Sequence, residues 1–364
     1  MQDKVTSKKE DISRFLCENC GANMIYSPSA GGLHCEYCGH KEEVRITGFV
    51  EERSFDEFIR AGAQRLTPMA VNALQVQCSS CGATVNFTPP ETATVCAFCG
   101  GKIVAQPKAA DPLVAPHGVL PFSISTGLAA DGFKKWLHSL WFAPSKLKHL
   151  AESDKLVSIY IPYWTYDAAT VSDYSGQRGD NYTEWETVTV NGKQERRSVT
   201  KTRWTSVSGR VARRFDDVCV PATTSIRREY LERLEPWDLP ELRPYEPAYL
   251  SGHKAEAYRV PLDGGFERFK EIAQGIIVSD CKRDIGGDRQ HVNDVNANYS
   301  NISFKHILLP VYSGGYRFGG KTYQIVINGR TGQVHGGRPY SVLKIVALIC
   351  VLLFIVLLIV AVFS

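Results

Sequence analysis

The sequence lacks the motifs that mark two large classes of hydrolase. It contains neither G-x-S-x-G, which presents a nucleophilic serine, nor H-E-x-x-H, which binds a catalytic zinc ion. The stretch before the first cysteine has no apolar run, so we expect no secretory signal. The net charge of +4 is too small to indicate a nucleic-acid partner by itself. We therefore expect a protein that faces the cytoplasm and is not an enzyme.

The composition is that of a folded protein. Of 364 residues, 44% are hydrophobic and 22% are charged, which is enough apolar material for a core and unlike a disordered chain. A chain of this length predicts two or three domains.

Cysteine is plentiful, and its spacing is the strongest signal in the chain. Eight of the eleven cysteines form four C-x-x-C pairs. In a reducing compartment such pairs indicate metal binding rather than disulfides. The predicted zinc ligands are Cys17, Cys20, Cys35, Cys38, Cys78, Cys81, Cys96 and Cys99.

The four pairs form an internal repeat. CENCGAN…CEYCGHK recurs as CSSCGAT…CAFCGGK with equal spacing, and a glycine follows every C-x-x-C. Four thiolates complete a tetrahedral zinc site, and glycine accepts the positive φ of the turn around the metal. We predict two β-rich zinc ribbons, over residues 1–50 and 73–106, each folded by one structural Zn²⁺. A thioredoxin-like redox motif is the alternative, and His34 and His40 are expected at the surface.

The C-terminal stretch is the longest apolar run. Residues 345–363 read IVALICVLLFIVLLIVAVF without a charge, and as a helix they would span about 28 Å, close to the thickness of the bilayer core. Arg330, Arg338 and Lys344 precede the run, and positive charge favours the cytoplasmic side. We expect a transmembrane anchor over 341–364, in the inner membrane, with the rest of the chain in the cytoplasm.

Between the ribbons and the anchor we predict an α+β domain, residues 122–340, with an antiparallel sheet and hairpins. Asn191-Gly192 predicts a hairpin within 185–211, and helical spacing recurs in 127–144, 224–235 and 264–283. A helical spacer (51–72) would separate the ribbons, and the proline- and alanine-rich stretch 107–121 reads as a linker.

One stretch, GYRFGGKT (315–322), matches the phosphate-loop pattern G-x-x-x-x-G-K-[ST]. A working phosphate loop lies between a strand and a helix, whose N-terminus binds the phosphates. After Thr322 the sequence alternates as Tyr323, Ile325 and Ile327, which predicts a strand. We therefore predict a β-hairpin and no nucleotide site.

Other polar groups are weaker candidates. Asp280, Asp284, Asp288 and His291 could form an acid or metal site, but Gly286-Gly287 more simply caps the preceding helix, with Asp288 holding the turn. We expect His253 and His306 to be satisfied histidines, and Cys219 and Cys281 to be buried thiols.

The predicted hairpin is basic. Residues 182–214 hold eight lysines and arginines against three glutamates, a net charge of +5, with Trp185 and Trp204 interleaved. This pattern suits an anionic membrane, a nucleic acid or a solvated strand face, and the sequence leaves the three open.

The order of these motifs resembles a family of bacterial tail-anchored membrane proteins with two TFIIB-type zinc ribbons, often labelled primosomal protein N′ (replication factor Y)-like helicases. Besides the cysteine sets, the residues that carry the resemblance are IPYWTYDA (161–168), YSGQRGD (174–180), TRWTSVSGRV (202–211), RRFDDV (213–218), LEPWDLPELRPYEPAYLSGHKAEAY (234–258), DIGGDRQ (284–290), FKHILLPVY (304–312) and NGRTGQVHGGRPYS (328–341). No DEAH-type box accompanies them, so we expect no helicase activity.

The resemblance implies a role in assembly at the membrane. Such proteins are similar to membrane-anchored partners of a phage-shock-protein-A-like, ESCRT-III-related remodelling coat, and some are linked to a flotillin-like protein. The resulting hypothesis is an adaptor that recruits soluble proteins to the inner membrane. The alternative is a membrane-tethered nucleic-acid-binding protein.

Overall fold

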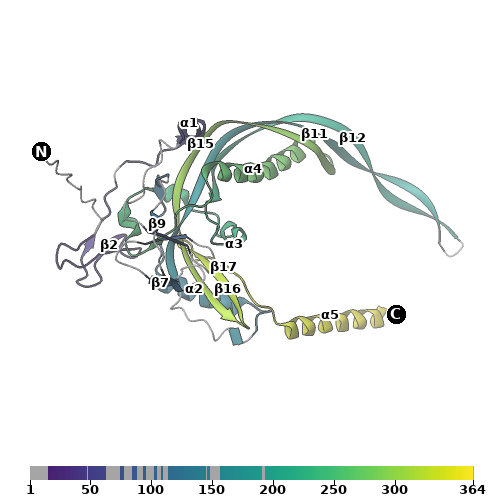
Figure 1. Ribbon diagram of the computed structural model, residues 1–364. Helices are drawn as coiled ribbons and strands as arrows, with labels where there is room; N and C mark the ends of the chain where they lie inside the picture. Colours follow the sequence, from purple (N-terminus) through teal and green to yellow (C-terminus); the bar gives the residue numbers. More distant parts are fainter. Residues whose placement is uncertain are drawn as a thin grey trace.

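The computed structural model describes residues 15–46, 48–62, 114–144, 146–147, 156–190 and 193–363, and five short strands between 63 and 113 by backbone only (Figure 1). Those five strands are β5 (Leu74–Gln77), β6 (Thr84–Phe87), β7 (Ala93–Val95), β8 (Lys102–Val104) and β9 (Lys108–Ala109). β5 pairs with β6 and β9, and β7 pairs with β8.

Three very long strands build the main sheet. β11 (Val157–Val190) lies between β12 (Lys193–Pro221) and β15 (Arg289–Phe318), antiparallel to both. Figure 1 shows them as one arched ribbon. The segments are rich in β-branched and aromatic residues, which favour strands. The antiparallel sheet predicted for this domain is confirmed.

Shorter strands complete the nine-stranded sheet. They are β4 (Arg53–Ser54), β10 (Gly118–Val119), β13 (Arg243–Pro244), β14 (Lys254–Ala255), β16 (Lys321–Asn328) and β17 (Val334–Gly336). Two of these pairings are parallel, β10 with β15 and β14 with β11. The sheet is therefore mixed at its centre.

Helix α4 (Leu262–Ile285) covers the inner face of the arch (Figure 1). Its buried residues Phe266, Phe269, Ala273, Ile277 and Cys281 recur at helical spacing, so one stripe packs on the sheet. This bears out the helix expected over 264–283. The glycine cap is also confirmed, because Gly286 has φ +64 and its N–H bonds to the carbonyl oxygen of Lys282.

Apart from the C-terminal helix described below, the other helices are shorter than α4. They are α1 (Phe55–Ala61), α2 (Thr126–Ser139), α3 (Arg228–Glu232) and the 3₁₀ turns η4 (Leu239–Glu241) and η5 (Pro247–Leu250). The helix expected over 224–235 shrinks to the five residues of α3, and the one expected over 127–144 ends at Ser139. Within the expected spacer helix (51–72), the structure describes α1. This helix packs firmly on the main domain, because Phe58 is buried in the core beside Phe304.

The linker prediction fails for residues 114–121. Val114 and Leu120 are buried, and β10 pairs with β13 and β15 in the main sheet. Proline punctuates this stretch, so no periodic pattern marks it as a strand, yet its apolar residues complete the core.

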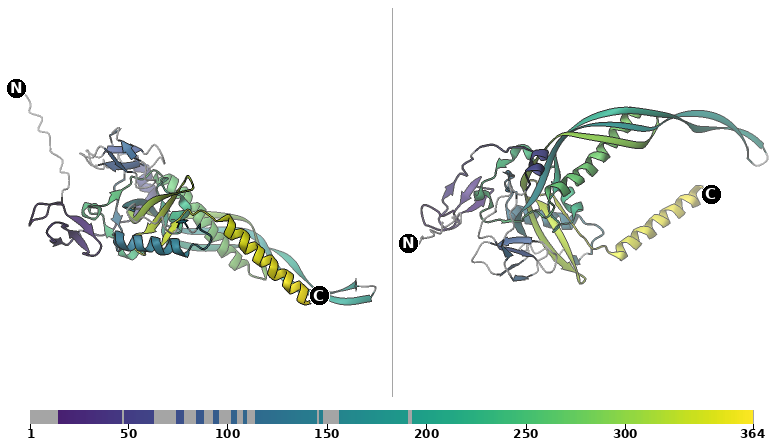
Figure 2. Two further views of the ribbon diagram at one scale, coloured as in Figure 1. Left: turned by 90° about the horizontal axis from the view of Figure 1, so that it is seen from below. Right: turned by 45° about the horizontal axis from the view of Figure 1, so that its top comes forward.

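The main sheet continues as a two-stranded arm, residues 180–203. β15 begins at Arg289, which pairs with Gly179, so beyond that point β11 and β12 have only each other. Figures 1 and 2 show the arm reaching beyond α4. The pairing of β11 with β12 continues to Val190 and Lys193, which confirms the predicted hairpin. The turn at 191–192 lies outside the described residues.

Helix α5 (Val342–Phe363) ends the chain and stands apart from the sheet (Figures 1 and 2). Val342–Ala361 has a mean hydropathy of 3.4, and none of it is buried. By length and composition this helix could cross a membrane.

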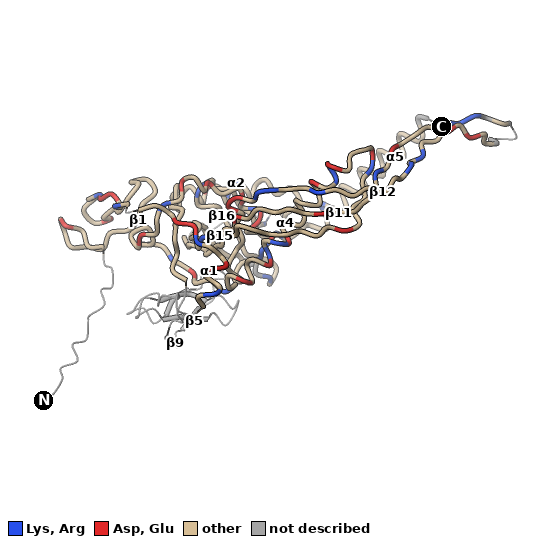
Figure 3. The backbone as a smooth tube through the Cα atoms, turned by 90° about the horizontal axis from the view of Figure 1, so that it is seen from above, with Lys and Arg blue, Asp and Glu red and all other residues tan. Residues whose placement is uncertain are grey.

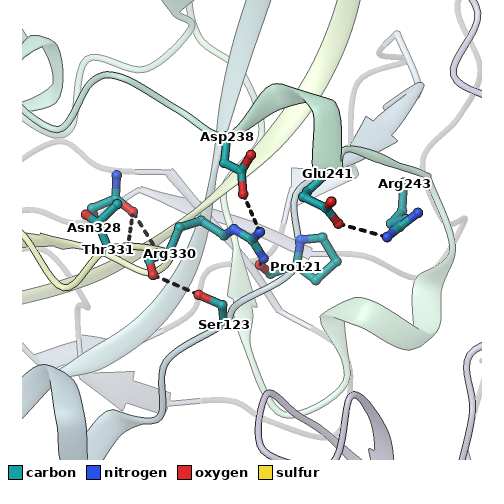
Figure 4. Close-up of polar contacts among 8 residues, drawn as sticks. All are labelled: Pro121, Ser123, Asp238, Glu241, Arg243, Asn328, Arg330 and Thr331. Carbon is teal, nitrogen blue, oxygen red and sulfur yellow. Dashed lines mark hydrogen bonds and ion pairs between the residues drawn. The ribbon is translucent and has the colours of Figure 1, made fainter.

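The turn after β16 joins distant parts of the fold (Figure 4). Asn328 is fully buried and donates to the carbonyl oxygen of Leu234 at 2.8 Å, while its own side-chain oxygen accepts from the backbone N–H of Arg330 at 2.7 Å. The Arg330 guanidinium binds Asp238 at 2.7 Å and is only 17% exposed. Arg330 therefore holds a loop, and its charge is paired with that of Asp238. Of the three positive charges that precede the apolar run, Arg338 and Lys344 are the ones close to the start of α5.

Candidate metal centre

Four cysteines converge near the N-terminus. Residues 15–46, here called the cysteine module, contain β1 (Ile25–Ser27), β2 (Gly32–His34) and β3 (Lys41–Glu42). The four sulfur atoms of Cys17, Cys20, Cys35 and Cys38 all lie within 4.8 Å of one another. Two of the separations are 3.4 Å, Cys17 to Cys38, and 3.5 Å, Cys20 to Cys35.

The spacing fits a four-thiolate metal site. Zn–S bonds of about 2.3 Å in a tetrahedron place sulfur atoms about 3.8 Å apart. All four thiols are free of disulfides. Four soft sulfur ligands in this arrangement favour a zinc-type ion.

The backbone turns alike around both C-x-x-C pairs. The N–H of Gly21 donates to the carbonyl oxygen of Cys17 at 2.8 Å, and that of Gly39 to Cys35 at 2.9 Å. Both glycines have positive φ, +71 and +77. This is the role that the sequence predicted for the glycine after each pair.

One thiol is prepared for ionisation. Backbone N–H groups of Cys38 and then Tyr37 lower the pKa of the Cys35 thiol to about 6. Such a cysteine is a thiolate at neutral pH, the form that binds metal.

The cysteine module is fastened to the main domain. The N–H of Tyr26 donates to the carbonyl oxygen of Ser251 at 2.9 Å, and the Ser251 hydroxyl donates to the carbonyl oxygen of Met24 at 2.7 Å. The Tyr26 ring meets the edge of Tyr249 at 5.3 Å between centroids. Cys17 and Cys35 belong to the same buried cluster as these rings, whereas Cys20 and Cys38 are exposed, so the candidate metal site lies at the edge of the core.

The second predicted ligand set lies outside the described residues. Cys78, Cys81, Cys96 and Cys99 fall in the gaps between β5 and β6 and between β7 and β8. Among the described residues, the structure brings the first set together.

The other predicted site residues are dispersed. Asp280 accepts from Arg213 Nη2 at 2.8 Å, and this arginine lowers the pKa of the Asp280 carboxyl. Asp284 accepts from the hydroxyl of Tyr174, and Asp288 from a backbone N–H of the arm. His291 lies on β15 opposite Gln177. Each acid contacts β11 or β12 rather than a common site, and Asp288, which was expected to hold its own turn, instead accepts from Asn181.

His253 and His306 lie inside the fold, but they are satisfied only in part, because Nδ1 of His253 and Nε2 of His306 are buried without a hydrogen-bond partner among the described residues. His253 stacks on Phe122, with ring centroids 4.5 Å apart, where the cysteine module meets the sheet. The Nδ1 of His306 lies 2.8 Å from the carbonyl oxygen of Val114, and its backbone N–H donates to Nδ1 of His117 at 3.0 Å. At the surface, the Nδ1 of His40 lies 3.3 Å from the side-chain amide of Asn19.

The predicted buried thiols are found in the core. Cys281 is fully buried on α4, and Cys219 packs against the core from β12. Burial raises the pKa of both thiols, so each stays protonated at neutral pH.

We predict that the buried histidine pair makes the protein acid-sensitive. Burial lowers the pKa of His306 to about 4 and that of His117 to about 3, against about 6.5 in an unfolded chain. Between these values the unfolded state binds more protons, so stability is full above about pH 6.5 and is lost as the pH falls through 4. His306 alone accounts for a loss of the order of 2–3 kcal/mol.

The His306→Asn variant tests this prediction, because asparagine can keep a donor near Val114 without titrating. Chemical denaturation should show a shallower loss of stability between about pH 7 and pH 5 than in the parent protein. Acid release of metal affects both proteins equally. An unchanged pH dependence would contradict the prediction.

The phosphate-loop match folds as a hairpin. β15 ends at Phe318, β16 begins at Lys321, and these two residues pair. The intervening Gly319 and Gly320 both have positive φ, +57 and +77, as a two-residue type I′ turn requires. No helix follows Lys321, so the helix N-terminus that a phosphate loop needs is replaced by a strand.

Substitutions in this turn should separate geometry from chemistry. Gly320→Val should destabilise the protein by about 1–2 kcal/mol, because a β-branched residue resists positive φ. Lys321→Ala should change stability by less than about 0.5 kcal/mol, since Lys321 is exposed. Denaturation curves measure both. Saturable binding of Mg-ATP that is lost in Lys321→Ala would overturn the hairpin interpretation.

Lysines, arginines and acidic residues mark the backbone of the arm (Figure 3), and because side chains alternate along a strand, the paired strands carry them on two faces. On one face Lys201 forms ion pairs of 2.7 Å with Glu184 and Glu186, and Arg203 lies over Tyr182. The other face carries Trp185, with Arg196 over its ring at 6.0 Å. Several of the eight cations are thus engaged, including Arg210 with Asp173 and Arg213 with Asp280. The nucleic-acid alternative stays a prediction.

Sequence reasoning missed one cluster. Carboxylate oxygens of Glu52, Asp167 and Asp217 lie within 4.8 Å of one another around Lys305, whose ammonium is 2.9 Å from Glu52 and 2.5 Å from Asp217. Burial raises the pKa of Asp167 to about 6. Since the buried lysine forms ion pairs with Glu52 and Asp217, we interpret the cluster as a junction that ties the segment before α1 to the sheet. No motif could have revealed it, because its members are far apart in sequence.

The chain is similar to the uncharacterized protein YdjG of Bacillus subtilis (strain 168). The two are 26% identical over 339 residues, which cover 92% of this chain and 93% of YdjG. No protein-family model matches the chain. No solved structure matches it. The similarity extends over nearly the full length of both proteins.

Proposed function

We propose that this protein is a tail-anchored zinc adaptor that recruits soluble partners to the inner membrane. The observation that carries the proposal is the pairing of two features in one fold. A four-thiol site, two of whose cysteines are in the core, lies in the N-terminal module, and an exposed apolar helix of membrane-spanning length lies at the C-terminal end. A zinc site that holds a surface module, joined to an anchor, suits presentation of a binding surface at a membrane.

The proposal includes a second zinc ion, held by Cys78, Cys81, Cys96 and Cys99. Its support is backbone register. In the first set, each C-x-x-C is framed by paired residues, Leu16 with Asn23 and His34 with Lys41. The second set has the same frames at the same spacing, since Gln77 pairs with Thr84 and Val95 with Lys102. Both sets therefore suit one zinc ribbon each.

The partner surface proposed here is the exposed side of the cysteine module. Tyr37, between the second pair of ligands, is 86% exposed, and Leu16 beside Cys17 is 52% exposed. Exposed aromatic and aliphatic side chains on a metal-stiffened turn are typical anchors for a protein partner. The resemblance noted above suggests a phage-shock-protein-A-like coat, with a flotillin-like protein as a further candidate.

The proposed orientation places residues 1–340 in the cytoplasm. Arg338 and Lys344 flank the start of α5, and positive flanking charge favours the cytoplasmic side.

Vesicle flotation tests the adaptor proposal. Vesicles carrying the full chain should float a purified phage-shock-protein-A-like protein, and Tyr37→Ala should weaken this recruitment while the chain itself stays in the vesicles. Tyr182→Ala on the arm is the matched control and should have no effect. Salt-dependent capture of DNA or RNA, with no recruitment of the protein, would favour the nucleic-acid alternative.

A further inference from the structure

The start of α5 is fastened to the loop that follows α2. The N–H of Ser341 donates to the carbonyl oxygen of Phe142 at 2.7 Å. The Lys344 ammonium donates to the carbonyl oxygens of Trp141 at 3.0 Å and Ala143 at 2.7 Å. The positive charge of Lys344 is therefore bound to protein carbonyls, and the residue-141 loop is held beside the first turn of α5.

The segment before α5 is tethered as well. The N–H of Gly337 donates to the carbonyl oxygen of Gln324 at 3.0 Å. The hydroxyl of Tyr316 donates to the carbonyl oxygen of Gly337 at 2.8 Å. Pro339 is buried. Contacts at both ends thus leave little free chain between the sheet and α5.

Around this junction, two large aromatic side chains face outward. Trp141 is 76% exposed and Tyr340 is 56% exposed. The guanidinium of Arg338 lies over the Tyr340 ring at 5.5 Å and donates to its hydroxyl at 3.3 Å. An arginine and a tyrosine therefore directly precede the apolar helix, and a tryptophan lies on the loop that is bonded to its first turn.

We propose that Trp141, Tyr340 and Arg338 form a lipid-binding collar that lies in the headgroup layer of the bilayer that α5 enters. This rests on the proposed function, in which α5 crosses the membrane. Tryptophan and tyrosine concentrate at membrane interfaces because their rings are apolar and their N–H and O–H groups remain hydrated. Arg338 matches the phosphate groups at the same depth.

Two observations favour lipid over a protein partner as the occupant. The collar is continuous with α5, since Trp141 is bonded through its carbonyl to a residue in the first turn of that helix. Exposed side chains near Trp141 and Tyr340 include the cations Lys146 and Arg338, which complement anionic headgroups. The collar would hold the α2 end of the main domain against the membrane surface.

Tryptophan quenching tests the collar in the full chain. The protein is placed in vesicles of phosphatidylcholine and phosphatidylglycerol, with bromine attached either near the headgroup or deep in the acyl chains. We expect shallow bromines to quench more strongly than deep ones. Trp141→Phe should remove most of the quenchable fluorescence, whereas the Trp185→Phe, Trp204→Phe double variant should leave it in place.

A second variant keeps Trp141 but changes how firmly its loop is held beside α5. Lys344→Met removes the two bonds from the Lys344 ammonium to the residue-141 loop, while the bond from Ser341 to Phe142 remains. The loop is then held less firmly, so Trp141 quenching should fall while the protein still floats with the vesicles. Equal quenching in Trp141→Phe and the parent protein would overturn the collar, as would stronger quenching by deep bromines. A chain that does not float at all would instead contradict the membrane anchor.

Discussion

Cys35→Ser is expected to remove one zinc ion and release the cysteine module from the main domain. Cys35 is fully buried in the cluster that joins this module to the sheet. Structural zinc sites contribute about 10–16 kcal/mol of apparent binding energy in small zinc-binding peptides, which exceeds what so small a module can gain from its own core. Elemental analysis should give one zinc per chain instead of two. Limited proteolysis should cut within 15–46.

Cys281→Ser is the matched control, because Cys281 is equally buried but lies on α4, outside the cluster of ligands. Like Cys35→Ser, this variant replaces a buried thiol with a hydroxyl. It should lower the free energy of unfolding, while both proposed zinc ions remain bound. A Cys35→Ser protein with its full zinc content and a protease-resistant module would refute the proposed role of the site.

Deleting residues 342–364 is expected to move the protein from the membrane to the soluble fraction. α5 is entirely apolar after Lys344, and among the described residues its hydrogen bonds to the main domain come from its first turn and from Ser341 just before it. Burying such a helix in lipid is strongly favourable. The collar residues alone would bind the membrane more weakly than α5, since interfacial side chains bind reversibly. Fractionation at high salt measures the effect.

Replacing residues 345–363 with an unrelated run of leucine and alanine provides the control and should restore membrane binding. Retention of the truncated protein in the membrane at high salt would show a second anchor elsewhere in the chain.

Features with a local signal could be predicted from the sequence. The apolar stripe of α4, the alternation in β16 and the Asn191-Gly192 dipeptide each depend on residues a few positions apart, and each produced the expected element. The first cysteine set was found for the same reason, because a metal imposes a fixed spacing on its ligands.

Features that depend on distant contacts were not predictable. The two residues of β10 become strand only because β13 and β15 lie on either side. The docking of Tyr26 on Ser251 and the binding of Glu52 to Lys305 join segments more than two hundred residues apart. Hydrophobic periodicity carries no information on such pairings, since it reports only which face of an element is buried.

The collar shows the same limit. The role proposed for Trp141 depends on its contact with Lys344, and the loop after α2 meets the start of α5 only in the folded protein. In sequence, Trp141 lies within the amphipathic helix expected over 127–144, whereas in the structure that helix ends at Ser139.

The zinc content of full-length protein recovered from membranes tests the account most directly. Elemental analysis of protein extracted in mild detergent, with its cysteines reduced, measures both ends of the proposal in one sample. The account predicts two zinc ions per chain in the membrane fraction. Membrane-bound protein with intact cysteines and no zinc would contradict it, as would zinc-loaded full-length protein found only in the soluble fraction.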